Sequence, residues 1–223
     1  MALGASKIPG MRLPLWMKLA WTLWVMIWMP VYWKQYGAQN FLFFCDLGNF
    51  LVAVALWTES ALIFSWQATG LLLFQTLYTL DLIISLLFHK HPIGGTEYMF
   101  DPTIPLAVRL LSLFHVVMPP LLVWAVWRLG YDSRGWKFQT LTTWIVVPIN
   151  YVWRREYNVN WARGLFFHEQ HVVPGLIYLL GYLIVAPLLV YFPTHLLLQW
   201  WMGKRSAKGL SSDALASNSL NPT

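Results

Sequence analysis

The stretch ALIFSWQATGLLLFQTLYTLDLIISLLF, residues 61–88, decides the fold class of this chain. It holds 28 residues and a single charged side chain, that of Asp81. About 20 consecutive, mostly apolar residues are enough for a helix to cross the hydrocarbon core of a bilayer. Residues 61–88 therefore predict a membrane-spanning helix that carries a charge within it.

Five further apolar stretches surround this one, so we expect an all-α, polytopic membrane bundle of six transmembrane helices. The six predicted spans are residues 14–33, 41–57, 61–88, 104–127, 138–153 and 173–201. Five or seven spans also fit, because the second and fifth are short and two prolines interrupt the sixth. We expect residues 1–202 to form one transmembrane domain and residues 203–223, rich in Ser, Ala, Asn and Gly, to form a disordered cytoplasmic tail.

The composition also indicates a membrane environment. The chain is 58% hydrophobic and 11% charged, with a mean hydropathy of +0.53, whereas about a quarter of a soluble domain is charged. Many of the 15 Trp residues lie near the ends of apolar stretches, as in the aromatic belts of membrane proteins. The net charge of +6 is spread over the loops, so we expect membrane lipids and no nucleic acid as partners.

The distribution of basic residues predicts the orientation. With six spans both termini lie on one side, which holds nine Lys and Arg residues against five on the other. Cytoplasmic loops carry an excess of Lys and Arg. We therefore expect a multi-pass protein with both termini in the cytoplasm, in a bacterial-type plasma (inner) membrane.

Ionisable side chains inside the predicted spans mark the candidate site. Asp46, Asp81, Arg109 and His115 all fall in the outer half of the bilayer at ~1.5 Å per helical residue. Charge in hydrocarbon is costly, so such residues usually face a protein interior or a water-filled cavity and mark a working site. We expect Asp81 to pair with Arg109, because a buried acid needs a cation or donors.

Cys45 adds a nucleophile candidate to this group. His115 would act as its general base, and Asp46 or Asp81 would orient the imidazole. Asn49 lies four residues after Cys45 on the same helical face and would stabilise an oxyanion. The further supporting candidates are Ser112, Arg109 and Tyr78. The alternative is a structural role, in which the acids are hydrogen-bonded helix contacts, His115 is a neutral core residue and Cys45 a small buried one.

Two adjacent prolines follow His115 in the fourth span. Pro119 and Pro120 have no N–H group, so the carbonyls of His115 and Val116 lose their usual helical partners. We expect a kink at His115, with donors or water at the freed carbonyls.

A second group of polar residues lies in the two predicted outer loops. Its candidate metal ligands are His89, His91, Asp101, His168, Glu169 and His171. These side chains could hold zinc or another divalent metal, and the sequence predicts no other cofactor. The two histidines of HEQH, residues 168–171, are three apart and would share one face of a helix. Solvated histidines at the membrane surface are the alternative interpretation.

Two short stretches resemble known families. Residues 43–47, FFCDL, resemble the HLCDL-like signature of the YwaF-type bacterial membrane proteins, with Phe43 at the position of that signature's histidine. Residues 112–119, SLFHVVMP, resemble the histidine-then-proline helix of the androgen-induced-protein family of intramembrane lipid hydrolases. The second resemblance implies a Thr or Cys nucleophile and a His base that act on lipid esters. On this chain it implies Cys45 as the nucleophile and His115 as the base.

The sequence leaves four functional classes open. The first is an intramembrane hydrolase or acyl transferase that acts on a lipid ester, a lipid amide or another small apolar substrate. The second is a non-enzymatic carrier or channel in which Asp46, Asp81 and His115 relay protons or bind a cation. The third is a metal-dependent enzyme built on the outer-loop histidines. The fourth is a scaffold that assembles as an oligomer or with a partner subunit.

Overall fold

The computed structural model describes residues 13–153, 155–165 and 169–204, and this part of the chain contains helices and loops but no strand. The predicted all-helical class is therefore confirmed. Three helices in these ranges are long and apolar enough to cross a membrane, namely Ala61–Phe88, Leu106–Leu129 and Gly175–Lys204. The predicted tail lies outside the described residues beyond Lys204.

The helices follow one another closely along the chain. Their bounds are α1 Leu15–Tyr36, η1 Ala38–Leu42, α2 Phe44–Thr58, α3 Ala61–Phe88, η2 Glu97–Met99, α4 Leu106–Leu111, α5 Phe114–Leu129, α6 Gly135–Val152, η3 Arg155–Tyr157, η4 Val159–Trp161 and α7 Gly175–Ala186. A π-helical turn, η6 Pro187–Tyr191, continues α7, and the helix then runs to Lys204. The predicted span 61–88 coincides with α3, whereas the predicted span 104–127 covers both α4 and α5.

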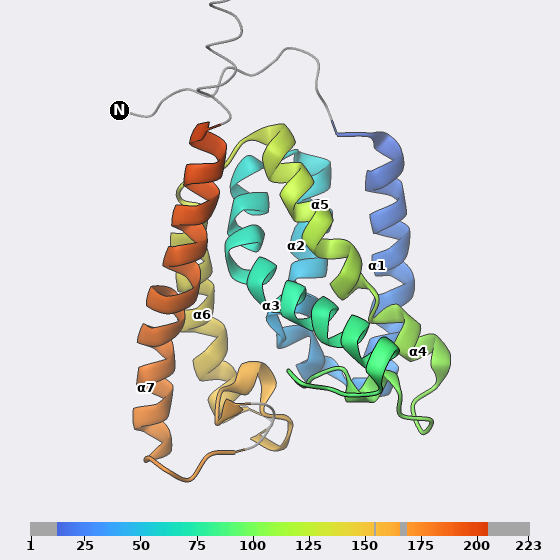
Figure 1. Cartoon of the computed structure of the whole chain (residues 1–223), viewed down its shortest axis with the longest axis vertical. Helices are drawn as coiled ribbons and strands as arrows, with labels where there is room; N and C mark the ends of the chain where they lie inside the picture. The colour runs from blue at the N-terminus through green and yellow to red at the C-terminus, as the bar shows by residue number, and fades with distance from the viewer. Residues whose placement is uncertain (1–12, 154, 166–168, 205–223) are drawn as a thin grey trace, which may run out of the picture.

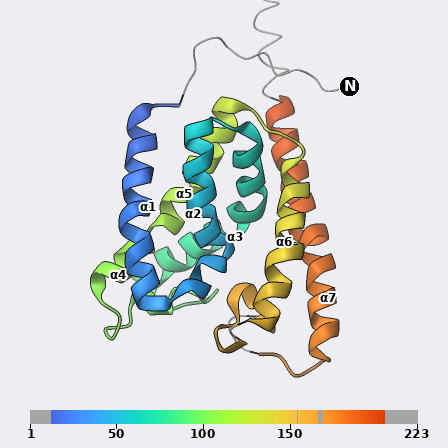
Figure 2. The same cartoon turned by 180° about the vertical axis from the view of Figure 1, so that it is seen from behind.

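The central helix of the bundle is α3, which packs against α2, α5 and α6. Helices α1 and α7 lie on opposite sides of the bundle (Figures 1 and 2). The start of α1 and the end of the helix that begins with α7 lie at one end of the bundle (Figure 1). Segments 89–105 and 155–165 lie at the opposite end, which we call the loop end.

The bundle exposes many large apolar side chains and buries several polar ones. Large apolar side chains are more than half exposed on the outward faces, for example Leu23 on α1, Ile145 on α6 and Leu189 on η6. Polar side chains such as Gln75 on α3 and Thr143 on α6 are buried between the helices. Lipid accepts an apolar outer surface and leaves polar groups to find partners inside the protein. The arrangement is compatible with an integral membrane protein.

Trp28 is the centre of the aromatic core. Its side chain is fully buried, and its ring lies 5.2–5.9 Å, centroid to centroid, from the rings of Tyr32, Phe41, Phe50 and Phe114. These rings come from α1, η1, α2 and α5, so one side chain joins four elements.

Replacing Trp28 by Ala is expected to lower the free energy of unfolding by about 3–5 kcal/mol, because the cavity that it leaves cannot collapse fully. Thermal unfolding in detergent micelles measures this loss. The matched control is Trp16→Ala, since the Trp16 side chain is 67% exposed on the same helix. Equal losses of stability in the two variants would contradict this account of the core.

Candidate functional site

His115 lies in the first turn of α5, directly after a break in the helix. Helix α4 ends at Leu111 and α5 begins at Phe114, so the kink predicted at His115 occurs three residues earlier, at Ser112–Leu113. Helix α5 runs through both prolines. The His115 carbonyl, which Pro119 leaves without a helical donor, accepts a hydrogen bond of 3.3 Å from the Thr79 hydroxyl of α3.

The imidazole of His115 is held in one tautomer. Its Nδ1 lies 2.7 Å from the carbonyl oxygen of Ser112. A carbonyl only accepts, so Nδ1 carries the proton and Nε2 carries the lone pair. The ring is stacked between those of Tyr78 and Phe114, at centroid distances of 4.2 and 4.0 Å. Backbone and packing therefore orient this histidine, and Nε2 is its basic atom.

A network of hydroxyl groups lies beside this ring. The Ser112 hydroxyl is 2.5 Å from that of Tyr32 and also bonds to Tyr98. The Tyr98 hydroxyl is 2.7 Å from that of Tyr78. Burial raises the pKa of the Tyr98 phenol, in the loop before α4, well above its ordinary value, so this group stays protonated. Side chains from α1, α3, η2 and the α4–α5 junction thus meet next to His115.

Cys45 and Asp46 approach the same network from the first turn of α2. Asp46 is buried and accepts hydrogen bonds from the Asn40 amide and, at 3.9 Å, from the Cys45 thiol. Cys45 packs against the apolar core that includes Tyr32 and Phe114. Among the described residues its thiol is hydrogen-bonded to Asp46 and not to His115. The structure therefore brings Tyr78 and Ser112 next to His115, and it packs Cys45 against the core that holds Tyr32 and Phe114.

Asp46 and Asp81 do not orient the imidazole of His115, contrary to the prediction from the sequence. Within the described residues, neither Asp46 nor Asp81 is hydrogen-bonded to His115. The Ser112 carbonyl supplies the orienting contact instead, because the break between α4 and α5 turns it toward the ring.

Asp81 anchors the segment that follows α3. Its carboxylate accepts hydrogen bonds from the backbone N–H groups of Ile93 and Gly94, at 2.8 and 3.2 Å, and from the Thr96 hydroxyl. His89, with a φ of 52°, ends α3 and turns the chain back over this carboxylate. Asp81 is completely buried by the returning segment.

The predicted pair of Asp81 and Arg109 is wrong. Arg109 donates instead to the carbonyl of Met99, at 2.9 Å, and no salt bridge joins it to Asp81 among the described residues. The backbone of residues 93–96 fills the acceptor sites of Asp81 first, since this segment is continuous with α3.

Asn49, the candidate oxyanion donor, is fully buried in α2. It lies one helical turn after Cys45. Neither its amide nitrogen nor its side-chain oxygen has a hydrogen-bond partner among the described residues. An unsatisfied buried amide is costly, so it is a donor available to a bound molecule or to water.

The candidate metal ligands do not come together in the described part of the chain. In the described ranges, no three His, Cys, Asp or Glu side chains are grouped closely enough to hold a metal. His91 is bound by Ser85 and Thr96, and Asp101 by Thr103, whose hydrogen bonds lower the pKa of the Asp101 carboxyl. His89 is exposed at the end of α3.

The HEQH segment does not form the predicted helical face. Glu169 to His171 are irregular, and His168 lies outside the described residues. Glu169 forms an ion pair with Arg163 at 2.6 Å. The periodicity of a helix therefore does not apply to these side chains.

Asn160, which the sequence analysis did not single out, ties a second loop to the start of α2. Its side chain accepts a 2.9 Å hydrogen bond from the N–H of Phe44 and donates one of 2.7 Å to the carbonyl of Leu42. Its backbone has a φ of 54°, in the left-handed region that asparagine tolerates best among residues with a Cβ. This contact fixes the turn that carries Cys45, and no local sequence pattern predicts it.

Comparisons of the chain with protein-family models, with curated proteins and with solved structures found no match. The assignment of a function therefore depends on the geometry of the site. Its two chemically competent groups are the Cys45 thiol at the start of α2 and the oriented imidazole of His115, which is stacked on Tyr78.

Proposed function

We propose that the protein is an intramembrane hydrolase or acyl transferase that acts on a lipid ester or amide. The observation that carries the proposal is the hydrogen bond from His115 Nδ1 to the Ser112 carbonyl, because it leaves Nε2 as a fixed base inside an apolar bundle. The Cys45 thiol, in the first turn of α2, is the nucleophile. The short resemblances of residues 43–47 and 112–119 support the same two residues.

In the first step, the Cys45 thiol gives its proton to Nε2 of His115 and the sulfur attacks the carbonyl carbon of the substrate. The bond to the alcohol or amine then breaks, the leaving group takes the proton from His115, and a thioester remains on Cys45. Water or an acceptor alcohol next attacks the thioester, with His115 again as the base. The acyl product leaves and Cys45 recovers its proton. Asn49 is the candidate donor to the oxyanion.

The proposed site lies below the extracytoplasmic surface of a six-span bundle with both termini in the cytoplasm. Helices α1, α2 and α6, beyond the three long apolar helices, also expose large apolar side chains outward, for example Met26, Val54 and Ile149. The loop end would face the outside. In this arrangement the lipid enters from the side of the bundle, while water or the acceptor enters from the loop end.

Replacing Cys45 by Ala is expected to lower the release of fatty acid from a short-chain phospholipid ester by at least about 10³-fold, because the covalent route is lost. Fatty acid is measured with the purified protein in detergent and in proteoliposomes. Cys45→Ala retains the small size of the side chain, and thermal unfolding checks that the bundle is intact. Full turnover by this variant would rule out the proposed nucleophile.

A further inference from the structure

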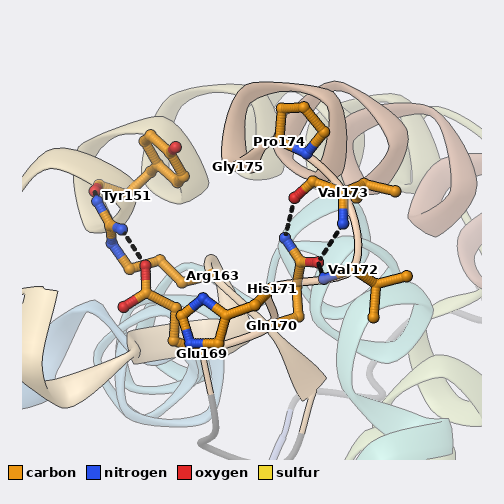
Figure 3. A pocket seen from close by; sticks show the side chains of 9 residues that line it. All are labelled: Tyr151, Arg163, Glu169, Gln170, His171, Val172, Val173, Pro174 and Gly175. Atoms are coloured by element: carbon orange, nitrogen blue, oxygen red, sulfur yellow. Dashed lines mark hydrogen bonds and ion pairs between the residues drawn. The ribbon is translucent and has the colours of Figure 1, made fainter.

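A cavity of about 450 Å³ lies at the loop end, apart from His115, between the end of α6 and the start of α7. Figure 3 shows the side chains that line it. They include Tyr151, Arg163, Glu169 and His171, with Val173 and Gly175 at the start of α7. Its volume is within the range of small-molecule sites in proteins.

Arg163 is the buried charge of this cavity, with 7% of its surface exposed. Its Nε and Nη2 donate to the Tyr151 carbonyl, at 3.2 and 2.9 Å, and its guanidinium lies 4.4 Å from the centre of the Tyr151 ring. Its Nη1 lies 2.6 Å from the Glu169 carboxylate. A guanidinium has five N–H groups, so two remain without a partner among the described residues. These contacts hold the Arg163 guanidinium in one orientation and leave two of its N–H groups available to a ligand.

Glu169 forms an ion pair with Arg163, but its own side chain is not held in place by the surrounding protein. Its side chain is 50% exposed, whereas that of Arg163 is 8% exposed, and it belongs to an irregular segment. The Glu169 carboxylate therefore lies at the position where the anionic group of a ligand would bind. Because it is half exposed, it would be solvated by water if a ligand displaced it from Arg163.

Two further features of the cavity favour an anion. The exposed imidazole of His171 has no hydrogen-bond partner among the described residues. The first N–H groups of α7 have no helical acceptor, since the first bond of this helix runs from Ile177 to the Pro174 carbonyl. The dipole of a long helix adds partial positive charge at this point.

We propose that this cavity binds a phosphate group and that Glu169 competes with it for Arg163. The phosphate oxygens would accept hydrogen bonds from the two remaining N–H groups of Arg163 and from the imidazole of His171. The rim of the cavity includes Val172, which is 92% exposed, and Pro174. This apolar rim beside an anion site fits the headgroup of a phospholipid, and free phosphate is the other source of the same chemistry. The proposal is independent of the reaction assigned to His115.

Binding to the full-length Cys45→Ala protein, which lacks the proposed nucleophile and so leaves the lipid esters intact, tests the proposal in dodecyl maltoside micelles with three probes. They are dihexanoyl-phosphatidylglycerol, dihexanoylglycerol without a phosphate, and inorganic phosphate. We expect saturable binding of the phosphatidylglycerol and much weaker binding of dihexanoylglycerol. Tighter binding of the phospholipid than of inorganic phosphate would identify the lipid as the source, and the reverse would identify the free ion. Equal binding of the two dihexanoyl probes would overturn the proposal.

Three variants make the result specific. Arg163→Gln is expected to weaken phosphate binding by at least about tenfold, because it removes a charge-assisted pair. Glu169→Gln is expected to strengthen binding by about two- to fivefold, because the competing charge is removed. His171→Gln is expected to weaken it by a few-fold.

The gain in Glu169→Gln distinguishes competition from a purely structural ion pair. This variant and His171→Gln leave the contacts of Arg163 with Tyr151 in place, so they remain informative if Arg163→Gln does not fold. Unchanged or weaker binding in Glu169→Gln would contradict the proposed competition.

Discussion

Replacement of His115 by Gln is expected to lower the turnover of a lipid ester by about 10²–10⁴-fold, the usual contribution of a positioned general base. Gln can still donate to the Ser112 carbonyl and fill the space between Tyr78 and Phe114, but it has no basic nitrogen. The loss should therefore be in the rate of acyl transfer and not in folding. Release of fatty acid in proteoliposomes and thermal unfolding of the same preparation measure the two separately.

His195 provides the matched control. It is also buried, and its Nδ1 lies 2.8 Å from the hydroxyl of Tyr131, in the loop between α5 and α6. His195→Gln is expected to retain turnover. A fully active His115→Gln protein, or the same loss in both variants, would show that His115 is not the base.

Replacement of Asp81 by Ala is expected to reduce the free energy of unfolding by about 2–4 kcal/mol. The change leaves two backbone N–H groups and the Thr96 hydroxyl without their acceptor, and each such group costs about 1–3 kcal/mol unless water replaces the carboxylate. Residues 89–105 should also be cleaved faster by protease. Asp81→Asn should lose less than half as much stability, since its side-chain oxygen still accepts from Ile93 and Gly94.

The Asn variant also separates anchoring from catalysis. If Asp81 only positions the segment after α3, Asp81→Asn retains turnover within about tenfold of the original protein, because the segment stays in place. A loss as large as that of His115→Gln, with normal protease resistance, would assign Asp81 a direct part in proton transfer.

The sequence predicts the helices well, because apolar length is a property of each segment alone. Residues 61–88 form one helix with the predicted bounds. The break at Ser112–Leu113 was expected nearer to the prolines, which remove donors from His115 and Val116. Proline fixes which carbonyls lose a partner, but the packing of α3 against α5 decides where the helix opens.

The site was predictable only where it is local. Ser112 and His115 are three residues apart in the sequence, so the bond between the imidazole and the Ser112 carbonyl is a local one. The partners of Asp81 are backbone N–H groups of a loop, which helical spacing cannot identify, so the pairing with Arg109 failed. Tyr32 and Tyr98 were missed because their hydroxyls reach Ser112 from distant segments.

The central claim is that acyl transfer passes through a thioester on Cys45 with His115 as the base. The most direct test is the mass of the peptide that contains Cys45, after acid quenching of a single turnover with a short-chain phospholipid ester. The account predicts an added acyl group on Cys45 that hydroxylamine removes, that forms slowly in His115→Gln, and that is absent in Cys45→Ala. Release of fatty acid at the normal rate with Cys45 unmodified throughout would contradict it.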